Sequence, residues 1–298
     1  MSVLAFDIGG SSVKYGLWHN NELTHKNSFP LPSSWIDMKN EFVNVLDSLR
    51  QFDIIGVALS APGIVNQRIG EINGVSAVSY IHDFPIVSEL EQLFKCHVSI
   101  ENDANCAALA EVWKGVAKEA EHCLFFVIGS GIGGAVVINK KLFKGKNLFG
   151  GEFGYMFLND SASLSELGSS VKAVETYNRL TGQNVTGEEL FKLAEEGNSL
   201  AIEITNRFFR AIAIGIYNLL VAFDPGLVIL GGGVSENPLL LEKICAQLDQ
   251  ILLERGITEM DFEMKRCLFR NDANLVGAVY NYLQKERESI SFNNNSFL

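Results

Sequence analysis

The sequence lacks long hydrophobic runs and has fewer basic than acidic residues. No segment approaches the roughly 18 consecutive apolar residues of a membrane-spanning helix, so no membrane partner is expected. The 24 Lys and Arg residues are outnumbered by 35 Asp and Glu residues, which gives a formal charge of −11. Proteins that grip a phosphate backbone do so with clustered basic residues, so no nucleic-acid partner is expected either.

Cysteine is also scarce, and the start of the chain carries no secretory pattern. The five cysteines are scattered, odd in number and without a C-x-x-C pair, which favours reduced, buried thiols over a disulfide framework. The apolar run from Val3 to Phe6 is followed at once by Asp7 and is too short for a signal sequence. A cytoplasmic protein is therefore expected.

What the sequence does contain is enough apolar material for a large core. Its 298 residues, of which 47% are hydrophobic and 20% charged, suit two packed α/β units or one large unit. Residues 98–105 are predicted to carry the catalytic residues. In this stretch an apolar strand ends in Glu101, Asn102 and Asp103 and passes directly into an alanine-rich helix. Ligands of open α/β sheets bind outside the carboxyl ends of strands. We therefore predict that Asp103 is a general base over which two lobes close.

Two glycine-rich turns are predicted to bind phosphate. Gly9, Gly10, Ser11 and Ser12 separate two strands at the start of the chain, and residues 129–134 (Gly-Ser-Gly-Ile-Gly-Gly) do the same later. Adjacent glycines permit a turn with positive φ, leave no Cβ to block an approaching ligand and allow a nest of backbone N–H groups. An ordinary hairpin nevertheless explains either turn taken alone. The repetition indicates an internal duplication. Neither turn has P-loop spacing.

The remaining pattern alternates strands and helices. Helices are predicted near residues 35–50, 86–94, 170–181, 187–196, 200–223, 238–255 and 273–285, with strands at 54–60, 226–230 and 263–269. Residues 64–85 are expected to be an irregular loop, and the Asn- and Ser-rich tail 289–298 is expected to fray.

Taken in order, these motifs resemble those of the ROK family (repressor, open reading frame, kinase), which shares its fold with hexokinase and actin. The resemblance covers nearly the whole chain, and its matching segments are Asp7-Ile8-Gly9-Gly10-Ser11, Ala61-Pro62-Gly63, Glu101-Asn102-Asp103-Ala104-Asn105, Gly129-Ser130-Gly131-Ile132-Gly133-Gly134, Gly151-Glu152-Phe153-Gly154, Gly231-Gly232-Gly233 and Leu275-Val276-Gly277-Ala278.

The resemblance implies an α/β, two-lobed, actin-like (ribonuclease H-like) ATPase fold with an interlobe cleft. One lobe would comprise residues 1–117, joined by the C-terminal helix 273–286, and a larger lobe would comprise residues 118–272. It also implies an ATP-dependent sugar kinase, with Asp103 taking the proton from the attacking hydroxyl. Phosphoryl transfer needs alignment and charge neutralisation more than covalent help, and a carboxylate can supply the base.

By the same resemblance, Asp7 would help to hold Mg²⁺ through water. The nucleotide would be bound by Asp7, Gly9, Gly10, Ser11, Ser12, Gly129, Ser130, Gly131, Gly133, Gly231, Gly232 and Gly233. Sugar hydroxyls would be contacted by Asn102, Glu152, Gly63 and Tyr155. A homodimer is compatible with the family.

The sequence departs from the family at a structural zinc site. The family's zinc-binding His is replaced by Tyr155, and residues 156–166 contain no cysteine, so no zinc site is expected. A family Glu that grips the anomeric end of the sugar falls at Ser165, with Glu166 next to it. Loss of that grip makes a β-glucoside a candidate substrate beside free glucose, phosphorylated at the 6-hydroxyl. N-acetylmannosamine or another hexose is the alternative, with Tyr155 supplying a hydrogen bond.

Two other classes of function fit the sequence less well than a kinase. A sugar-sensing repressor of this family would carry a helix-turn-helix domain before the first phosphate strand, which here begins at Val3. A non-catalytic sugar-binding protein would have lost the base or the glycine turns, and both are present. The tetrapeptide Asn-Asp-Ala-Asn recurs at 271–274, where a helix N-cap is sufficient to explain Asp272.

Overall fold

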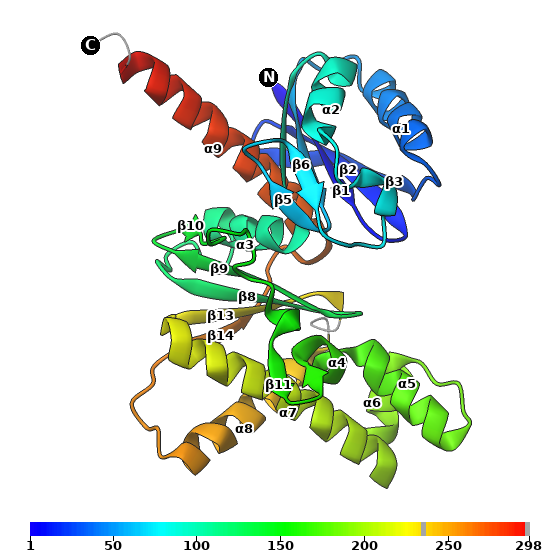
Figure 1. Ribbon diagram of the computed structural model, residues 1–298, viewed down its shortest axis with the longest axis vertical. Helices are drawn as coiled ribbons and strands as arrows, with labels where there is room; N and C mark the ends of the chain where they lie inside the picture. The colour runs from blue at the N-terminus through cyan, green and yellow to red at the C-terminus, as the bar shows by residue number, and fades with distance from the viewer. Residues whose placement is uncertain (234–236, 296–298) are drawn as a thin grey trace. The chain divides into compact units, whose positions relative to one another are not determined.

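The computed structural model describes residues 1–233 and 237–295. The chain forms two compact units. Unit 1 comprises Met1–Gly115, Gly145–Phe149 and Asn271–Leu298, and unit 2 comprises Val116–Lys144 and Gly150–Arg270. Each unit is built around its own five-stranded sheet (Figure 1).

The sheet of unit 1 has the strand order β3-β2-β1-β4-β7. β1 pairs antiparallel with β2 and β2 with β3, whereas β4 and β7 continue the sheet in parallel. The strands are β1 (Ser2–Ile8), β2 (Ser12–His19), β3 (Glu22–Pro30), β4 (Ile54–Ala61) and β7 (His97–Asn102). A small hairpin of β5 (Ile64–Asn66) and β6 (Glu71–Asn73), followed by the 3-10 turn η1 (Ser79–Ile81), leaves the end of β4.

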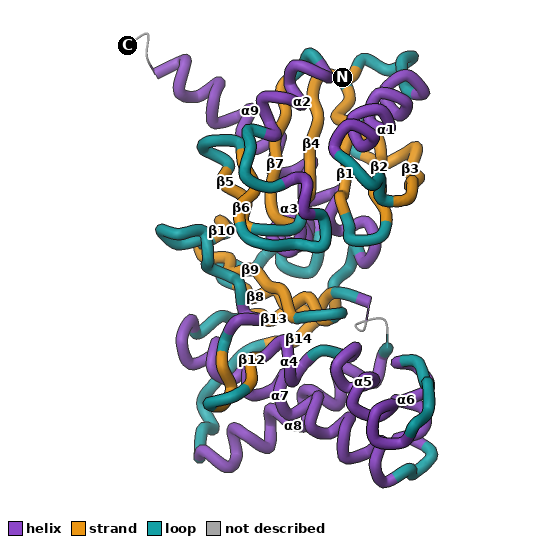
Figure 2. Tube along the Cα trace, turned by 45° about the vertical axis from the view of Figure 1, so that its right-hand side comes forward, coloured by secondary structure: helices purple, strands orange, loops and turns teal. Residues whose placement is uncertain are grey.

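Helices cover both faces of this sheet because β1 is apolar on both sides. Leu4, Phe6 and Ile8 share a core with α1 (Trp35–Ser48) and α2 (Ile86–Phe94). Val3 and Ala5, which point the other way, share a core with α3 (Asp103–Lys114) and α9 (Ala273–Asn295). In Figure 2 the strands are orange and these helices purple.

Unit 2 repeats the same strand plan, with the order β10-β9-β8-β13-β14. An antiparallel meander is again followed by two parallel strands, which confirms the predicted internal duplication. The strands are β8 (Cys123–Ile128), β9 (Ile132–Ile138), β10 (Lys141–Leu142), β13 (Leu227–Gly231) and β14 (Glu263–Arg266).

A layer of helices packs on the unit 2 sheet through one large core. Phe126 of β8 and Phe208 of the longest helix are both fully buried in it. The helices are α4 (Leu164–Gly168), α5 (Ser170–Thr181), α6 (Gly187–Glu195), α7 (Ser199–Phe223) and α8 (Pro238–Arg255). Shorter elements are η2 (Phe153–Tyr155), β11 (Phe157–Asn159), β12 (Ala162–Ser163) and the turn η4 (Arg270–Asp272), which leads into α9.

Several elements differ from the sequence prediction. β3 was not predicted, because its residues are mostly polar; it is an edge strand with an exposed face, and such strands need no apolar pattern. The segment 64–85, expected to be irregular, contains β5, β6 and η1. α9 runs to Asn295, so most of the tail expected to fray is helical, and residues 296–298 lie outside the described part.

Two expectations about composition can be compared with the structure. All five cysteines are free thiols, and Cys106, Cys123 and Cys267 are buried. Among the described residues, no helix combines the length and apolar character needed to cross a bilayer.

Candidate active site

Three polar side chains line up where the parallel strands of unit 1 end. Asp7 of β1 is paired in register with Ser60 of β4, and Ser60 with Glu101 of β7. Residues opposite one another on neighbouring strands point to the same face of a sheet. All three are buried, so the carboxyl edge of this sheet carries two buried acids separated by a hydroxyl group.

Asp7 is held from one side. Its Oδ1 accepts hydrogen bonds from the Ser60 hydroxyl (2.8 Å) and from the Asn274 amide of α9 (3.0 Å). Its Oδ2 accepts none from the described residues. Burial raises the pKa of the Asp7 carboxyl above its ordinary value, and the two hydrogen bonds and the nearby Lys14 charge offset only part of that rise. A buried carboxylate with one uncommitted oxygen fits a water ligand of a hard cation such as Mg²⁺.

Glu101 organises the neighbouring strand end. Its Oε1 accepts from the Asn102 backbone N–H (2.8 Å) and from the Asn105 side-chain amide (3.1 Å), and its Oε2 accepts from the Gln67 amide. Gln67 also donates to Asn281 of α9 (3.1 Å). Glu101 therefore ties the strand end to the first turn of α3 and to the β5–β6 hairpin.

Asp103 occupies the predicted junction, as the first residue of α3 directly after β7. Its Oδ1 accepts from the Ala104 backbone N–H (2.8 Å). Asn102 is the N-cap of the helix and accepts from the Asn105 N–H (3.1 Å). The partial positive charge at the N-terminus of a helix stabilises a carboxylate placed there. Rigid elements thus hold this acid on both sides.

Gly63 lies beside this junction. The Asn102 side-chain amide donates to the Gly63 carbonyl (3.1 Å), so the structure brings together three residues predicted for the sugar and the base. Gly63 has φ of +102°, and a Cβ there would lie 2.9 Å from His82 Cε1. Only glycine suits both the left-handed conformation and the close approach.

The first hairpin, between β1 and β2, has exposed backbone at its tip. The Gly9 N–H donates to the Ser12 carbonyl (3.0 Å), whereas the N–H groups of Gly10 and Ser11 have no partner among the described residues. One of the two predicted properties of its glycines, a positive φ, is absent from both Gly9 and Gly10. The other, the absence of a Cβ, matters here for packing as well, because a Cβ on Gly10 would lie 3.2 Å from Ala77 Cβ.

The second hairpin, between β8 and β9 in unit 2, repeats this design. The Gly129 N–H donates to the Gly131 carbonyl (3.0 Å), and neither glycine has positive φ. A Cβ on Gly129 would meet nothing within 4 Å, so the approach to this turn is open. Gly133 follows in β9, opposite Val127.

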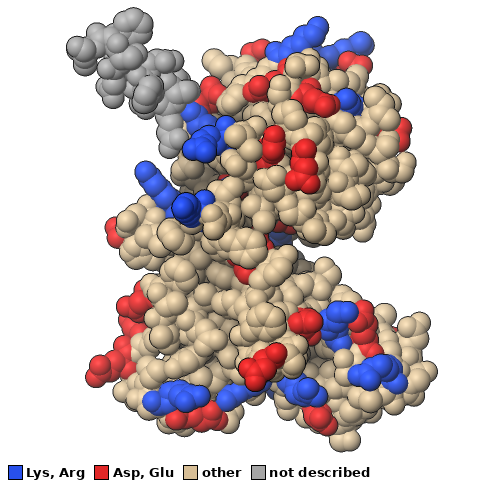
Figure 3. All heavy atoms as spheres, viewed as in Figure 1, with Lys and Arg blue, Asp and Glu red and all other residues tan. Residues whose placement is uncertain are grey.

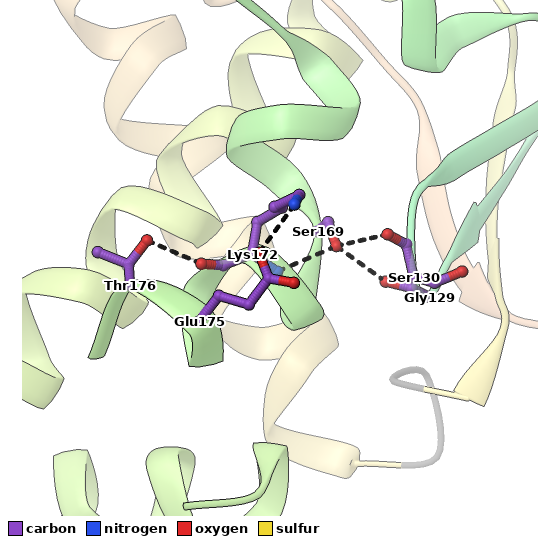
Figure 4. A network of polar contacts seen from close by, with 6 residues as sticks. All are labelled: Gly129, Ser130, Ser169, Lys172, Glu175 and Thr176. Atoms are coloured by element: carbon purple, nitrogen blue, oxygen red, sulfur yellow. Dashed lines mark hydrogen bonds and ion pairs between the residues drawn. The ribbon is translucent and has the colours of Figure 1, made fainter. Parts of the chain in front are cut away.

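Hydroxyl groups of the helical layer fix this second hairpin in place (Figure 4). The Ser169 hydroxyl, at the N-cap of α5, donates to the Ser130 carbonyl (2.7 Å), and the Ser170 hydroxyl donates to the Gly129 carbonyl (3.3 Å). The carbonyls of the turn are held by serines, and the N–H groups of Ser130 and Gly131 have no partner among the described residues, as a nest for phosphate oxygens requires.

Replacing Ser169 by Ala is expected to weaken nucleotide binding more than stability. The change removes the hairpin anchor together with an N-cap, which is worth about 1 kcal/mol. We expect the KM for ATP to rise about three- to tenfold in steady-state kinetics, in line with the loss of one positioned hydrogen bond. Thr186→Ala, which removes the N-cap of α6 in the same unit, is the control. An equal rise in the control would contradict the anchoring role.

The third predicted glycine stretch ends β13. Gly231 is the last residue of that strand, and a Cβ on it would lie 2.7 Å from the Phe125 ring. Gly232 has φ of +89°, and a Cβ on it would lie 2.4 Å from the Ile128 carbonyl oxygen. Gly233 is exposed. Gly232 therefore packs directly on the strand that leads into the second hairpin.

Glu152 precedes the turn η2 of unit 2, and Tyr155 is its last residue. Phe153 anchors this turn by packing on Phe126, with ring centroids 4.8 Å apart. Burial raises the pKa of the Glu152 carboxyl. Tyr155 is 64% exposed. A partly desolvated carboxylate gains by accepting hydroxyl donors, which suits the predicted contact of Glu152 with a sugar.

Ser165 and Glu166, where the family Glu was expected to fall, both make hydrogen bonds within unit 2. The Ser165 hydroxyl accepts from the Ile132 N–H (2.9 Å), so it supports the second hairpin. The Glu166 carboxylate accepts from the Ser163 N–H (2.7 Å) and hydroxyl (2.8 Å) in a capping box at the start of α4. Both side chains therefore have structural partners within unit 2.

No group of three or more His, Cys, Asp or Glu side chains that could hold a metal ion occurs within the described part of the chain. The prediction that zinc is absent stays a prediction, as do the roles assigned to individual site residues. The donors around Asp7 fit a cation bound through water, because a single carboxylate is then sufficient.

Sequence reasoning missed the residues that surround Asp7 and the second hairpin. Asn274 was part of a tetrapeptide interpreted only as a helix cap, yet its amide reaches Asp7, and Asp272 forms an ion pair with Lys26 (2.7 Å). Ser60 and Ser169 belong to no motif. The one sequence signal for Asn274 was the repeated tetrapeptide Asn-Asp-Ala-Asn, whose second copy, like the first, lies at the start of a helix.

The chain is similar to known proteins over nearly its whole length. The model of the ROK family matches residues 3–285. A β-glucoside kinase of Listeria innocua is 33% identical over 96% of this chain and 99% of its own length. An N-acetyl-D-glucosamine kinase of Haemophilus influenzae is 30% identical over 80% of this chain and 86% of its own.

Solved structures give the same result. A ROK family protein of Streptococcus pneumoniae, in complex with sucrose, is 33% identical with a TM-score of 0.89, over 97% of this chain and all of that one. A suggested N-acetylmannosamine kinase of Listeria monocytogenes, also 33% identical, has a TM-score of 0.87 over 96% of this chain and all of that one.

Proposed function

The chain belongs to the ROK family and is a sugar kinase with the family's α/β, two-lobed, actin-like fold, and from this premise we propose that it phosphorylates the 6-hydroxyl of a glucose unit in a β-glucoside. Relatives named β-glucoside kinases, such as those of Listeria innocua and Klebsiella pneumoniae, match 96% of this chain. The assignment as a kinase does not depend on the relatives that are named hexosamine kinases.

The β-glucoside proposal is supported by the contacts of the two residues at the position where the family's anomeric-end Glu is expected. The Ser165 hydroxyl accepts from the Ile132 N–H, and the Glu166 carboxylate accepts from the Ser163 N–H, so we propose that neither grips an anomeric hydroxyl. A buried polar group built to bind an anomeric hydroxyl would reject a substrate that lacks it. Without such groups, an aglycone attached at that position is tolerated.

The proposed mechanism uses the residues in the roles that their surroundings favour. Asp103 accepts the proton of the sugar hydroxyl as its oxygen attacks the γ-phosphorus of ATP, and ADP leaves. Asn102, capping the same helix, and Glu152, partly desolvated in unit 2, would orient the other hydroxyls. Gly63 and Tyr155 are proposed to contact the same sugar. Because phosphoryl transfer depends on alignment, positioned hydrogen bonds contribute most of the effect.

The nucleotide is proposed to be bound by the two hairpins. The N–H groups of residues 10–11 and 130–131 would donate hydrogen bonds to phosphate oxygens, and Gly231 to Gly233 would allow the adenosine to approach without a side chain in the way. Sugar kinases generally use ATP with a divalent metal ion, which neutralises developing charge on the phosphates. Asp7 would hold Mg²⁺ through water by its open Oδ2.

Substrate choice is tested by ADP release across a panel of sugars. With MgATP, we expect cellobiose, gentiobiose and methyl β-glucoside to be used with kcat/KM at least equal to that of glucose. A markedly higher kcat/KM for N-acetylmannosamine or N-acetylglucosamine would overturn the β-glucoside proposal and leave the kinase in place. The hexosamine alternative is supported by the 30% identity with the Haemophilus influenzae kinase.

Asp7→Asn is expected to stabilise the protein while impairing catalysis. A carboxyl with a raised pKa in the folded state contributes stability below its ordinary value of 3.8, and this contribution is lost as the pH rises through the raised value. Asn has no charge to desolvate, so at pH 7.5 the variant should have a larger free energy of unfolding than the original protein. Denaturation at pH 7.5 and at pH 3.5 measures the difference, which should shrink at the lower pH.

The same variant should lose at least tenfold in kcat, since a neutral amide replaces the proposed ligand of the hydrated metal ion. Ser60→Ala, which removes one hydrogen bond to Asp7 and keeps its charge, is the control. A less stable Asp7→Asn protein at pH 7.5 would contradict the cost assigned to the buried charge.

A further inference from the structure

Unit 2 contains a large cavity that no part of the proposed reaction uses. Its volume is about 730 Å³, and it lies among α4, α5, α7, α8 and the start of the β11 hairpin. Helix α5 lines it with Lys172, Thr176 and Arg179, which recur every three or four residues and so share one face. No residue of the second hairpin or of the Gly231 to Gly233 stretch lines it. Cavities of this size commonly hold small molecules.

The inner wall of the cavity is apolar. Ala173 from α5 and Ile204, Phe208 and Ala211 from α7 line it, and all four belong to the buried core of the unit. These side chains offer no hydrogen-bond partner, so this wall suits the apolar body of a ligand. The basic groups of the cavity come from other residues of the same two helices.

Three arginines of the lining have uncommitted donors. Arg179 and Arg207 make no hydrogen bond or ion pair within the described residues. Arg210 donates from Nη2 to Glu254 (2.8 Å), but its Nη1 is buried and has no partner. A buried guanidinium nitrogen without a partner costs free energy, and an anion in the cavity would remove that cost.

The acidic residues of the lining do not neutralise these arginines. Glu166 is committed to the capping box of α4, and Glu203 makes no ion pair with any described residue. Lys172, a fourth basic residue, pairs with Glu175 (2.8 Å; Figure 4). On the face drawn in Figure 3, the basic side chains of the described residues are interspersed with acidic ones, so any preference for anions arises locally in this cavity.

We propose that this cavity binds a small phosphate monoester with an apolar body. Guanidinium groups match phosphate oxygens through paired N–H donors, and three of them on two helices suit the three terminal oxygens of a phosphate better than the two of a carboxylate. The apolar wall made by Ile204 and Phe208 receives the body of the ligand. The inference stands independently of the substrate proposed for the kinase.

Isothermal titration of the full chain with phenyl phosphate tests the site, with inorganic phosphate and phenol as partial ligands. We expect saturable binding of phenyl phosphate, weaker binding of phosphate and none of phenol. Arg179→Ala and Arg207→Ala should each raise the Kd about tenfold, the effect of losing one charge-assisted hydrogen bond. Neither arginine has a partner in the described structure, so both variants should fold and keep kinase activity.

Arg255→Ala is the matched control. Arg255 lies in the last turn of α8, outside the cavity, and its loss changes the net charge by the same amount. It should leave the Kd within about twofold of the original value. Absence of saturable binding, binding that survives loss of both Arg179 and Arg207, or an equal loss in Arg255→Ala would each overturn the proposal.

Discussion

Asp103→Asn is expected to lower the rate of sugar phosphorylation by at least about 100-fold, the lower end of what a positioned general base contributes. The amide keeps the size of the side chain and can still accept from the Ala104 N–H at the start of α3. It cannot accept a proton from the attacking hydroxyl. Sugar affinity, measured by titration calorimetry, should therefore remain within about threefold of the original, while turnover is lost.

The control for this variant lies in the chain itself. Asp272 occupies the same tetrapeptide, Asn-Asp-Ala-Asn, but forms an ion pair with Lys26 near the surface, where both side chains are more than a third exposed. Exposed ion pairs contribute little, so Asp272→Asn should leave the rate within about twofold. A rate for Asp103→Asn that equals that of Asp272→Asn would remove the base assignment.

Gly277→Ala is expected to destabilise unit 1 by about 3 kcal/mol or more, beyond the usual cost of overpacking. A Cβ on Gly277 of α9 would lie 1.6 Å from the Cys106 carbonyl oxygen of α3. Both partners are helix backbone, so neither can turn aside, and the two helices must separate. That separation opens the core formed by Val3, Ala5 and Tyr282.

Urea denaturation measures this effect, with Gly187→Ala as the control. Gly187 begins α6, and a Cβ there would meet nothing within 4 Å. Alanine is the better helix former by about 1 kcal/mol, so the control should be neutral or slightly more stable. The account of the α3–α9 contact would be wrong if Gly277→Ala unfolded at the same urea concentration as the original protein.

Much of the fold could be predicted because its strongest signals are local. Each glycine turn lies between apolar strands, and Asp103 lies between an apolar strand and an alanine-rich helix, so a few adjacent residues define each feature. The repeat of the turns predicted the repeat of the sheets. Residues 200–223, the longest periodic segment, correspond to α7 within one residue.

The features that could not be predicted depend on contacts distant in sequence. Asn274 reaches Asp7 across 267 positions, and Ser169 reaches Ser130 across 39. A serine or asparagine carries no signal of its distant partner. The conformation of the hairpin glycines was also wrongly predicted, because a glycine can be required for close approach as well as for positive φ.

The two sheets share one plan but differ in chemistry. Asp7 is the next-to-last residue of β1, and the corresponding residue of β8 is Val127. Ser60 of β4, opposite Asp7, corresponds to Gly231 of β13, opposite Val127. Unit 1 therefore carries buried acids at its strand ends, whereas the corresponding positions of unit 2, Val127 and Gly231, have no ionisable side chain. This division suits a metal ion and a base on unit 1 and nucleotide binding by main-chain groups on unit 2.

The most direct measurement is phosphorus NMR of the reaction mixture with MgATP and cellobiose or glucose. If the chain is a sugar kinase with Asp103 as its base, the original chain should give a new phosphomonoester resonance that is coupled to the C6 methylene protons. The same resonance should be almost absent with Asp103→Asn. No sugar phosphate from any of the sugars, or equal product from both proteins, would contradict the mechanism proposed for Asp103.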